Sequence, residues 1–509
     1  MDNLIGGKIF RNTLLFIILA EILSFLGYYN QTVNFGAFFI IIILVLILSL
    51  YRLEYGLYVL LAELLAGSFG YLFYFEANGF KISIRVALWL IIMSVWLAKT
   101  IIRLAKTKRL ELDFFRSPYL FYFLALFIFI ALGAINGLLK NNSLSNIFFD
   151  FNNWLYFSLI FLFFSVLRNN NLKIIKQIFL GAIIWLGLKT IILAYVFSHN
   201  FGLFALDLYL WTRRSGLGEI TQVIPGFNRI FMQSHIFVLI GFFVFLFYSL
   251  KDITDNANKI VMPGSTRHPE NLFLKKILDS SLPVRPTCPA GRQAGSVAGT
   301  TKYLVALVLF LSVIIISFSR SFWLGLAAGG LFIWLAAIFK LKINFKKFII
   351  FNSLAAASVI LGLALSFFII KFPYPETAGN FDAASLLSER ATRIIGEAGA
   401  SSRWQLLPPL WQKIKAAPIL GQGFGATVTY KSSDPRVLAE NPKGEYTTYA
   451  LEWGWLDVWL KLGIFGLLAY LVLFIKIIYD GFKMGSRASL SLAAGLIVIS
   501  AVNIFSPYV

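Results

Sequence analysis

The sequence predicts an all-α protein that crosses a membrane many times. Hydrophobic residues make up 59% of the 509 positions, charged residues only 14%, and the mean hydropathy is +0.78. A soluble globule has no interior large enough to bury so much apolar surface. Apolar runs of about 17 to 25 residues recur along the chain, and each is long enough to cross a hydrocarbon core of roughly 30 Å as a helix.

About thirteen such runs follow one another. Their approximate bounds are residues 12–29, 34–51, 55–75, 84–102, 118–139, 152–167, 175–197, 230–250, 303–319, 321–339, 348–371, 455–477 and 488–507. The first run carries Glu21, has no small-residue cleavage site and is followed at once by a second run. We therefore expect a true membrane helix there and not a removable signal peptide.

Positive charge in the short loops predicts the orientation of these spans. Every second crossing leads back to a basic segment, and these segments are Lys8 with Arg11, Arg52, 99–116, 168–176, 251–302, 340–347 and 476–487. The amino terminus is thus expected in the cytoplasm, and the net charge of +21 reflects topology and not a nucleic-acid surface. The water-soluble stretch 372–452 then lies outside the membrane, together with Arg213, Arg214, Arg229 and Arg320.

Composition divides the chain into four parts. Residues 1–200 form an amino-terminal transmembrane bundle, 201–250 an outer loop and a span, 251–302 a cytoplasmic insertion, and 303–509 a core that contains the outer loop 372–452. The insertion is rich in proline, glycine, serine and arginine without helical or strand periodicity, so we expect it to be disordered. A regulatory or docking loop is the alternative. Its single cysteine, Cys288, forms no internal disulfide, and His268 and Cys288 lack the spacing of a zinc site.

The outer loop carries local helix signals. Ser401 and Ser402 are expected to cap a helix that Pro418 ends and that Pro408 and Pro409 kink or divide. Arg403 and Trp411 share one face of it, and Leu407, Leu410 and Ile414 form a stripe suited to lie on the membrane surface. An earlier helical segment places Arg390 and Arg393 one turn apart.

The sequence GQGFG at 421–425 has two interpretations. Glycines either let backbone amides approach a ligand or make a tight turn. No strand precedes the sequence, and the outer compartment holds neither ATP nor NAD, so it is not a nucleotide fingerprint.

These residues, in this order, resemble a known family. Arg403, Trp411, Pro418, GQGFG and then EWGWLDVWLKLGIFG are similar to the catalytic region of O-antigen ligases and related bacterial polysaccharide polymerases. FSRSFWLGLAAGGLF, with Arg320, resembles the Ser-Arg element of the family, and the resemblance covers roughly residues 225 to 470. It implies a GT-C-like fold and an inverting, metal-independent glycosyltransferase without cofactor in the cytoplasmic (inner) membrane of a bacterium. Such an enzyme moves a glycan from a polyprenyl-diphosphate carrier to an acceptor hydroxyl of a glycan, lipid or protein outside the membrane.

The chemistry suggests roles for individual residues. Arginine forks bind phosphate oxygens without a metal, so Arg229, Arg320 and Arg403 are the candidates for holding the leaving diphosphate. The family usually carries a histidine about eleven residues before the glycine that opens its last conserved helix, and Glu452 holds that place relative to Gly463. Glu452, expected to be partly buried between loop and membrane, is the candidate base, with Arg403 as the second catalytic residue. Further candidates for substrate contact are Arg214, Trp411, Gly423 and Trp453.

Two other interpretations stay open at this point. Arginine and tryptophan at span ends also act as headgroup anchors, and Glu452 also fits a solvated loop carboxylate. Glu21, Glu63 and Lys189 within spans suggest a flippase for lipid-linked oligosaccharides or a secondary transporter, although a buried structural ion pair explains such charges equally well. A carrier has no need of a large outer loop rich in arginine, which favours the transferase.

Overall fold

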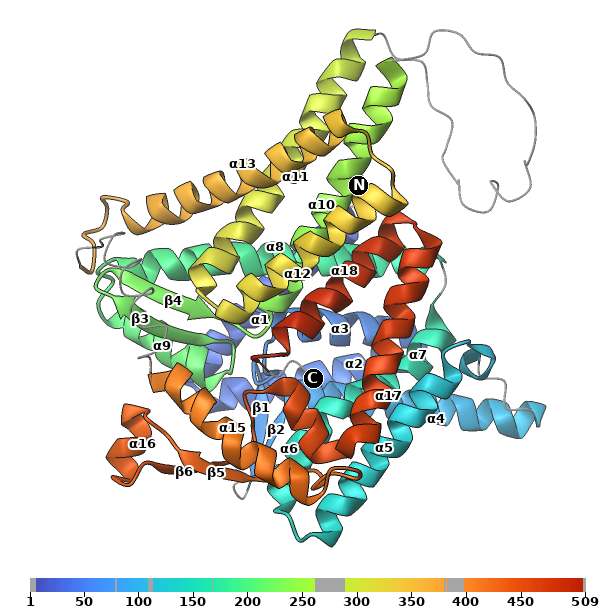
Figure 1. Ribbon diagram of the computed structural model, residues 1–509, viewed down its shortest axis with the longest axis vertical. Helices are drawn as coiled ribbons and strands as arrows, with labels where there is room; N and C mark the ends of the chain where they lie inside the picture. The colour runs from blue at the N-terminus through green and yellow to red at the C-terminus, as the bar shows by residue number, and fades with distance from the viewer. Residues whose placement is uncertain are drawn as a thin grey trace.

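The computed structural model describes residues 6–77, 80–108, 113–167, 169–260, 289–379, 381 and 398–506, and helices dominate these ranges (Figure 1). The helices are α1 (Lys8–Tyr29), α2 (Gln31–Tyr51), α3 (Leu53–Ala66), α4 (Ile84–Thr107), α5 (Leu120–Leu139), α6 (Leu144–Leu155), α7 (Leu159–Val166), α8 (Asn169–Ser198), α9 (Leu203–Arg214), α10 (His235–Ile260), α11 (Pro289–Ser317), α12 (Arg320–Leu335), α13 (Phe345–Ile370), α15 (Ala398–Ala416), α16 (Pro435–Glu440), α17 (Gly454–Met484) and α18 (Arg487–Val502). Short 3₁₀ segments lie at Asp113–Arg116 and Tyr156–Ser158, and a π-helical turn at Ala336–Lys340.

Within the described ranges, three two-stranded antiparallel sheets interrupt the helices, and none of them was predicted from the sequence. They pair β1 (Tyr74–Ala77) with β2 (Phe80–Ser83), β3 (Glu219–Ile224) with β4 (Phe227–Phe231), and β5 (Val428–Lys431) with β6 (Glu445–Thr448). The expected span 230–250 is corrected in part, because residues 227–231 form a strand and α10 begins only at His235.

The polytopic all-α membrane fold is confirmed. Within the described residues, nine helical segments are long and apolar enough to cross a membrane, and three shorter apolar helices lie at His235–Ser249, Tyr303–Ser317 and Arg487–Val502. The expected span 55–75 is shorter than predicted, because α3 ends at Ala66 and Gly70, at φ +83°, turns the chain toward the β1–β2 hairpin. The count of thirteen spans stays a prediction.

The insertion 251–302 differs from its expected disorder at both ends. Residues 251–260 continue α10, and 289–302 form the start of α11 (Figure 1). Residues 261–288, with His268 and Cys288, lie outside the described ranges, as do Arg390 and Arg393.

Loops that the charge pattern assigns to one side lie together in space. Among the predicted outer segments, the Tyr29 hydroxyl donates to Asp207 at 2.8 Å and Lys140 Nζ donates to the Gly421 carbonyl at 3.1 Å. Among the predicted cytoplasmic segments, Lys340 Nζ donates to the Lys483 carbonyl at 2.9 Å. This grouping agrees with alternating crossings, while the choice of inside and outside stays a prediction.

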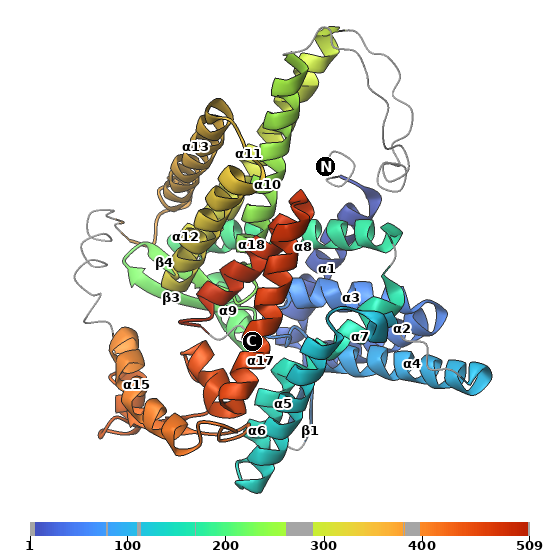
Figure 2. The ribbon, with the colours of Figure 1, turned by 45° about the vertical axis from the view of Figure 1, so that its right-hand side comes forward.

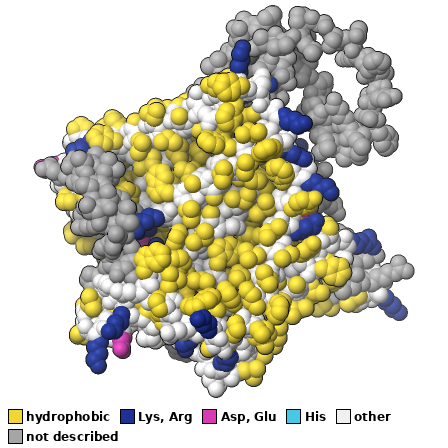
Figure 3. All heavy atoms as spheres, viewed as in Figure 1, with side chains coloured by type: hydrophobic (Ala, Val, Ile, Leu, Met, Phe, Trp, Pro, Cys, Tyr) yellow, Lys and Arg dark blue, Asp and Glu magenta, His cyan; other side chains and the backbone are white. Residues whose placement is uncertain are grey.

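Apolar side chains cover the exterior between these two groups of loops. Figure 3 shows one face occupied largely by hydrophobic side chains, with lysine and arginine mainly toward its borders. Phe16, Ile40, Phe121 and Ile360 are each at least 65% exposed, as expected for side chains that face lipid. In Figures 1 and 2, α10 and α11 extend at one end of the molecule, whereas α15 with β5 and β6 lies at the other.

Helices far apart in the sequence share their cores. α5 packs on α17, and α8 packs on α11, so helices of the expected amino-terminal bundle contact the carboxy-terminal core. Phe424, from the GQGFG segment, is fully buried in the cluster formed by α5, α6 and α17. This packing fixes the outer loop to the transmembrane helices beneath it.

Candidate active site

Arg403 and Glu452, the two residues expected to be catalytic, form an ion pair. Arg403 lies in α15, Glu452 lies just before α17, and Arg403 Nε donates to Glu452 Oε2. Their side chains are 36% and 50% exposed, so Glu452 is more open than the sequence predicted. An ion pair this exposed contributes only about 0–1 kcal/mol to stability. It therefore holds two charged groups in position and leaves both accessible to a ligand.

Tryptophan side chains border this ion pair. Trp453 Nε1 donates to the Arg403 carbonyl at 3.0 Å, and its ring meets that of Trp404 edge to face at 5.5 Å. Trp404 is 61% exposed. Trp404 was not predicted as a site residue, although its position directly after Arg403 was a signal in the sequence. An exposed indole beside two charged groups suits the apolar face of a sugar ring.

Tyr430 adds a neutral hydroxyl near the ion pair. It lies in β5, and its ring meets Tyr446 of β6 at 5.9 Å. Burial, together with the negative charge of Glu452, raises the pKa of the Tyr430 hydroxyl. The hydroxyl thus stays protonated at neutral pH and retains a proton that it can donate.

A buried lysine and aspartate fix the backbone that leads to Glu452. Lys461 Nζ lies 2.8 Å from Asp150 Oδ1 and donates to the Tyr449 carbonyl at 3.0 Å. Asp150 Oδ2 in turn accepts a 2.7 Å bond from the Gly425 amide. These contacts join α6, the GQGFG segment, the approach to Glu452 and α17. Neither Lys461 nor Asp150 was predicted as a site residue, although a lysine within an apolar span is a signal for a buried partner.

α17 breaks at Gly463, and the GQGFG segment fills the break. Gly463 has φ +73° and ψ 178°, which interrupts the helical hydrogen bonds around it. The carbonyls of Leu460 and Lys461 accept from the amides of Gln422 at 2.6 Å and Gly423 at 3.1 Å. A broken membrane helix is tolerated where neighbouring groups satisfy its backbone in this way.

Gly423 is a packing residue, so the structure supports the tight-turn interpretation of GQGFG and not the ligand contact. Its φ is +79°, and a side chain at this position would collide with the backbone of Gly137. The amide of Gly423 donates to the Lys461 carbonyl, and that of Phe424 donates to the Gly133 carbonyl. The amide of Gly425 donates to the Asp150 carboxylate. These amides therefore hold the turn against α5, α6 and α17.

α15 lies on the protein and not on the membrane surface, which corrects the expected stripe. Leu406, Leu410 and Ile414 are at most 2% exposed, and they pack in one cluster with Val428 of β5 and Leu460 of α17. The buried face thus contains Leu406, and not Leu407 as predicted, together with Leu410 and Ile414.

Pro408 and Pro409 lie inside α15 and do not divide it. Each proline removes the donor for the carbonyl four residues earlier, at Trp404 and Gln405. Both of these residues are exposed, so water can satisfy their carbonyls.

Trp411 of α15 contacts α17, as Arg403 contacts Glu452 just before that helix. Its ring meets that of Trp459 edge to face at 5.4 Å, and Lys415 Nζ lies 5.8 Å from the ring centre. With 41% of its surface exposed, Trp411 docks α15 and still presents part of its indole.

Arg229 contacts the turn between α11 and α12, and Arg320 lies in it. Arg229, in β4, donates from Nε to the Ser317 carbonyl at 2.9 Å, and its guanidinium lies 5.0 Å from the Phe231 ring. Arg320 is the first residue of α12, where the helix dipole favours negative ligands. Two of the three expected diphosphate ligands therefore lie at or against the 317–320 segment that joins α11 to α12.

The segment after α18 connects this turn with the Arg403–Glu452 pair. The Phe505 ring lies 5.2 Å from that of Trp453, and the Ser506 hydroxyl donates to Ser321 at 3.2 Å. In Figures 1 and 2 the start of α15 lies below the start of α12. The start of α12, the start of α15 and the segment before α17 thus lie in one region of the molecule.

Arg214 lies apart from the Arg403–Glu452 pair, at the end of α9. Its guanidinium lies 5.2 Å from the Tyr28 ring of α1. It lines a cavity with residues of α1, α2 and α9.

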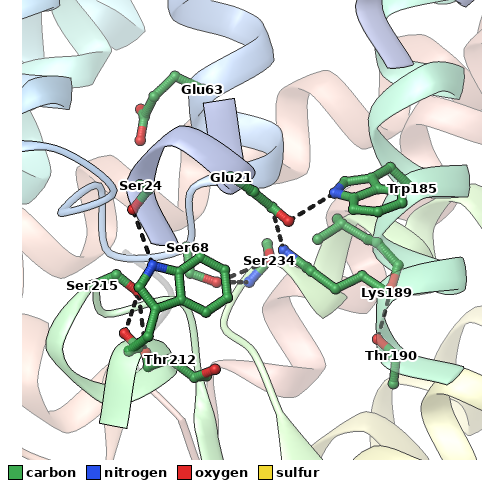
Figure 4. A network of polar contacts seen from close by, with 12 residues as sticks. Glu21, Ser24, Glu63, Ser68, Trp185, Lys189, Thr190, Thr212, Ser215 and Ser234 are labelled. Carbon is green, nitrogen blue, oxygen red and sulfur yellow. Dashed lines mark hydrogen bonds and ion pairs between the residues drawn. The ribbon is translucent and has the colours of Figure 1, made fainter. Parts of the chain in front are cut away.

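The charges that suggested a transporter are closed ion pairs. Lys189 Nζ lies 2.6 Å from Glu21 Oε1, and Trp185 Nε1 donates to Glu21 Oε2 at 2.9 Å (Figure 4). Arg85 Nε lies 2.7 Å from Glu63 Oε2. These are the buried structural pairs that the sequence left as the alternative to an ion path.

Comparison with known proteins finds a similarity to one family within the carboxy-terminal half of the chain. Residues 305–471 match a family model described as O-Antigen ligase. No curated protein and no solved structure matches the chain. The matched range includes Arg320, Arg403 and Glu452 but not Arg229 or Arg214, and it confirms the resemblance to O-antigen ligases. Together with the apolar helices, this similarity supports a multi-pass bacterial membrane protein with a general role in membrane glycan transfer.

Proposed function

We propose that this O-antigen ligase-like protein transfers a glycan from a polyprenyl-diphosphate carrier to an acceptor hydroxyl at the outer face of the cytoplasmic membrane. The observation that carries the proposal is the contact between Arg403 and Glu452 inside the matched domain. It combines a group suited to phosphate with a group suited to a proton, and both are partly exposed.

Glu452 is the proposed general base. The acceptor hydroxyl gives its proton to Glu452, and its oxygen forms a bond to the anomeric carbon of the donor. The bond from that carbon to the diphosphate oxygen breaks, and the electron pair leaves with the diphosphate. Attack from the side opposite the leaving group inverts the anomeric configuration, and no metal enters the proposed reaction.

Arg403 is proposed to couple donor binding to base activation. In the free protein it holds Glu452 by charge and by a hydrogen bond. A diphosphate offers more negative charge than one carboxylate, so the guanidinium is expected to turn toward it. Glu452 then loses part of its ion pair, and an unpaired carboxylate accepts a proton more readily.

Arg229 and Arg320 are proposed to hold the diphosphate from the α11–α12 turn. Their guanidinium forks bind phosphate oxygens in pairs, and the start of α12 adds favourable backbone charge. Charge that develops on the leaving group is thus stabilised by groups already in place. The exposed ring of Trp404 and the partly buried Trp453 are proposed to contact the sugar next to the reacting bond.

Transfer is tested directly with purified protein in nanodiscs, a defined polyprenyl-diphosphate glycan and candidate acceptors. Mass analysis is expected to find the glycan joined to an acceptor and an equal amount of free polyprenyl diphosphate. A glycan acceptor identifies a polymerase, and a lipid or protein acceptor identifies a ligase. In a parallel vesicle assay, movement of intact donor across the bilayer without transfer would instead support a flippase.

Sidedness is tested by cysteine labelling in cells, after Cys288 has been replaced by serine. Lys443→Cys reports on the proposed outer loop and Lys106→Cys on the proposed cytoplasmic end of α4, and both positions are exposed in the structure. A membrane-impermeant maleimide is expected to label only Lys443→Cys. Labelling of Lys106→Cys alone would place the ion pair of Arg403 and Glu452 in the cytoplasm.

A further inference from the structure

We propose a second glycan site, in the amino-terminal half of the chain and outside the matched O-antigen ligase domain. It is a cavity of about 200 Å³ between the outer-loop ends of α1 and α2, the β1–β2 hairpin and α9. We infer that it binds one pyranose ring that carries an anionic group. The identification of the ligand as a sugar rests on the proposed function, whereas the shape and charge of the cavity do not.

Aromatic rings form much of the cavity wall. Tyr28, Tyr71, Tyr74 and Trp211 all line it. The C–H faces of a sugar ring are apolar and pack on aromatic rings, while its hydroxyls need polar partners around them. Tyrosine and tryptophan provide both, because each has an apolar face and a polar group at its edge.

Buried hydrogen bonds hold these walls in place. The Ser24 hydroxyl donates to the Leu72 carbonyl at 2.6 Å and accepts from Trp211 Nε1 at 3.1 Å, and Figure 4 shows Ser24 in this network. Asn34 Nδ2 donates to the Tyr74 carbonyl at 2.8 Å. Ser24 and Asn34 are at most 5% exposed, so α1, α2 and the hairpin are fixed before any ligand binds. A preformed site binds without the cost of ordering its walls.

Polar groups inside this frame are free to meet a ligand. In the part of the chain that the structure describes, the hydroxyls of Tyr28, Tyr71 and Tyr74 and the side-chain amide of Gln31 bond to no other protein group. Tyrosine hydroxyls donate and accept, and a glutamine amide does both as well. Such a set matches the hydroxyls of a sugar.

The charge of the cavity favours an anionic ligand. Arg214 lines it, with its guanidinium 5.2 Å from the Tyr28 ring. Lys81 Nζ lies 3.7 Å from the centre of the Tyr74 ring, a lining residue. The residues that line the cavity include no aspartate or glutamate. A carboxylate on the sugar would therefore find the positive charge of Arg214, and also that of Lys81, which Glu76 attracts from the opposite strand of the hairpin without lining the cavity.

The volume limits the ligand to about one ring. Sites for drug-sized ligands enclose roughly 300–1,000 Å³, whereas this cavity has about 200 Å³. It lies next to the contact between Tyr29 and Asp207, on the side where the loops are predicted to be outside. We infer that it holds a sugar of the glycan at a distance from the reacting bond and thereby selects glycans with acidic residues.

Binding is measured by saturation-transfer NMR on the full chain in nanodiscs with three probes: methyl β-glucuronide, methyl β-glucoside and glycerol 3-phosphate. The glucuronide is expected to bind most tightly, because only it offers both a pyranose ring and an anion. Arg214→Gln is expected to weaken its binding about tenfold or more, the loss typical of a charge-assisted hydrogen bond. The matched control is Arg213→Gln, because Arg213 is exposed, bonds to the Tyr209 hydroxyl at 2.8 Å and does not line the cavity.

Three results would overturn the inference: no saturable binding of the glucuronide, equal binding by the Arg214→Gln protein, or tighter binding of glycerol 3-phosphate, which would indicate a lipid headgroup site. Glu452→Gln is expected to bind the glucuronide as the parent does, which separates this cavity from the proposed active site. Glucuronide binding by a protein that transfers no glycan would uphold the cavity and reject the proposed function. Glycan transfer by a protein that does not bind the glucuronide would uphold the proposed function and reject the cavity as a glycan site.

Discussion

Two ion pairs, Glu21–Lys189 in the amino-terminal half and Arg403–Glu452 in the carboxy-terminal half, each join a glutamate to a basic side chain under opposite conditions of burial. The Glu21–Lys189 pair has side chains 6% exposed on both sides, whereas Arg403 and Glu452 are 36% and 50% exposed. In the closed pair, Lys189 and Trp185 each donate to one carboxylate oxygen of Glu21. In the open pair, much of each charged group still faces solvent. Burial therefore separates charges that hold helices together from charges that can meet a substrate.

The reason lies in the cost of an unpaired charge. A carboxylate inside an apolar helix bundle is tolerated only with a partner, so its binding capacity is already used. At the edge of the membrane, water replaces a partner at little cost, and the group can exchange one partner for another. Substitutions in the two pairs should consequently affect stability in one case and turnover in the other.

The largest effect is expected in the closed pair. Lys189→Met leaves Glu21 buried without its counter-charge, which costs on the order of 3–5 kcal/mol. The thermal unfolding midpoint in nanodiscs should fall accordingly, and the double variant Glu21→Met/Lys189→Met should recover most of the loss. The control is Arg403→Gln, for which we expect a change of about 1 kcal/mol or less. Equal shifts for Lys189→Met and Arg403→Gln would remove the distinction between the pairs.

Glu452→Gln should reduce turnover by roughly 100-fold or more, because the amide keeps the size of the side chain but accepts no proton. Donor binding and the unfolding midpoint should stay near those of the parent protein. Glu440→Gln, at an exposed carboxylate of α16, is the matched control and should leave turnover unchanged. Parent-like turnover of Glu452→Gln would mean that the base lies elsewhere or that the acceptor needs none.

Arg403→Lys and Arg320→Lys should each lose most transfer activity, about tenfold, although the charge is kept. A single ammonium cannot reproduce the paired hydrogen bonds of the guanidinium fork. Initial rates at saturating donor test this, with Arg213→Lys as the control outside the site. Near-normal rates in both variants would indicate that Arg320 and Arg403 are membrane anchors.

The smallest expected change is a shift of the pH profile. Glu452→His should recover part of the activity that Glu452→Gln loses, since a neutral imidazole accepts a proton. Imidazole has an ordinary pKa of about 6.5, so the rate should rise as the pH passes upward through that value and fall below it. Rates measured between pH 5 and 8 test the shift. The same pH dependence in Glu452→Gln would assign the profile to another group.

The sequence by itself determined that the protein is a helical membrane protein, and it suggested most of the candidate site residues. Each predicted span overlaps a helix, because apolar length is a local property of the chain. The order of the Arg320 element, Arg403, Trp411, Pro418, GQGFG and EWGWLDVWLKLGIFG resembled O-antigen ligases, and the match over residues 305–471 supports that resemblance. The approach of Arg403 to Glu452 followed from neither composition nor periodicity.

The tertiary structure decided which of these groups meet and which are already occupied. Gly423 seemed available for a ligand, but its amide bonds to the carbonyl that the Gly463 break exposes. Lys461 and Asp150 come from distant helices and position the backbone before Glu452. Glu21 and Lys189 form a buried ion pair with each other. Hydrogen bonds and charge pairs between helices depend on contacts between distant parts of the chain, and local sequence patterns carry no information about those contacts.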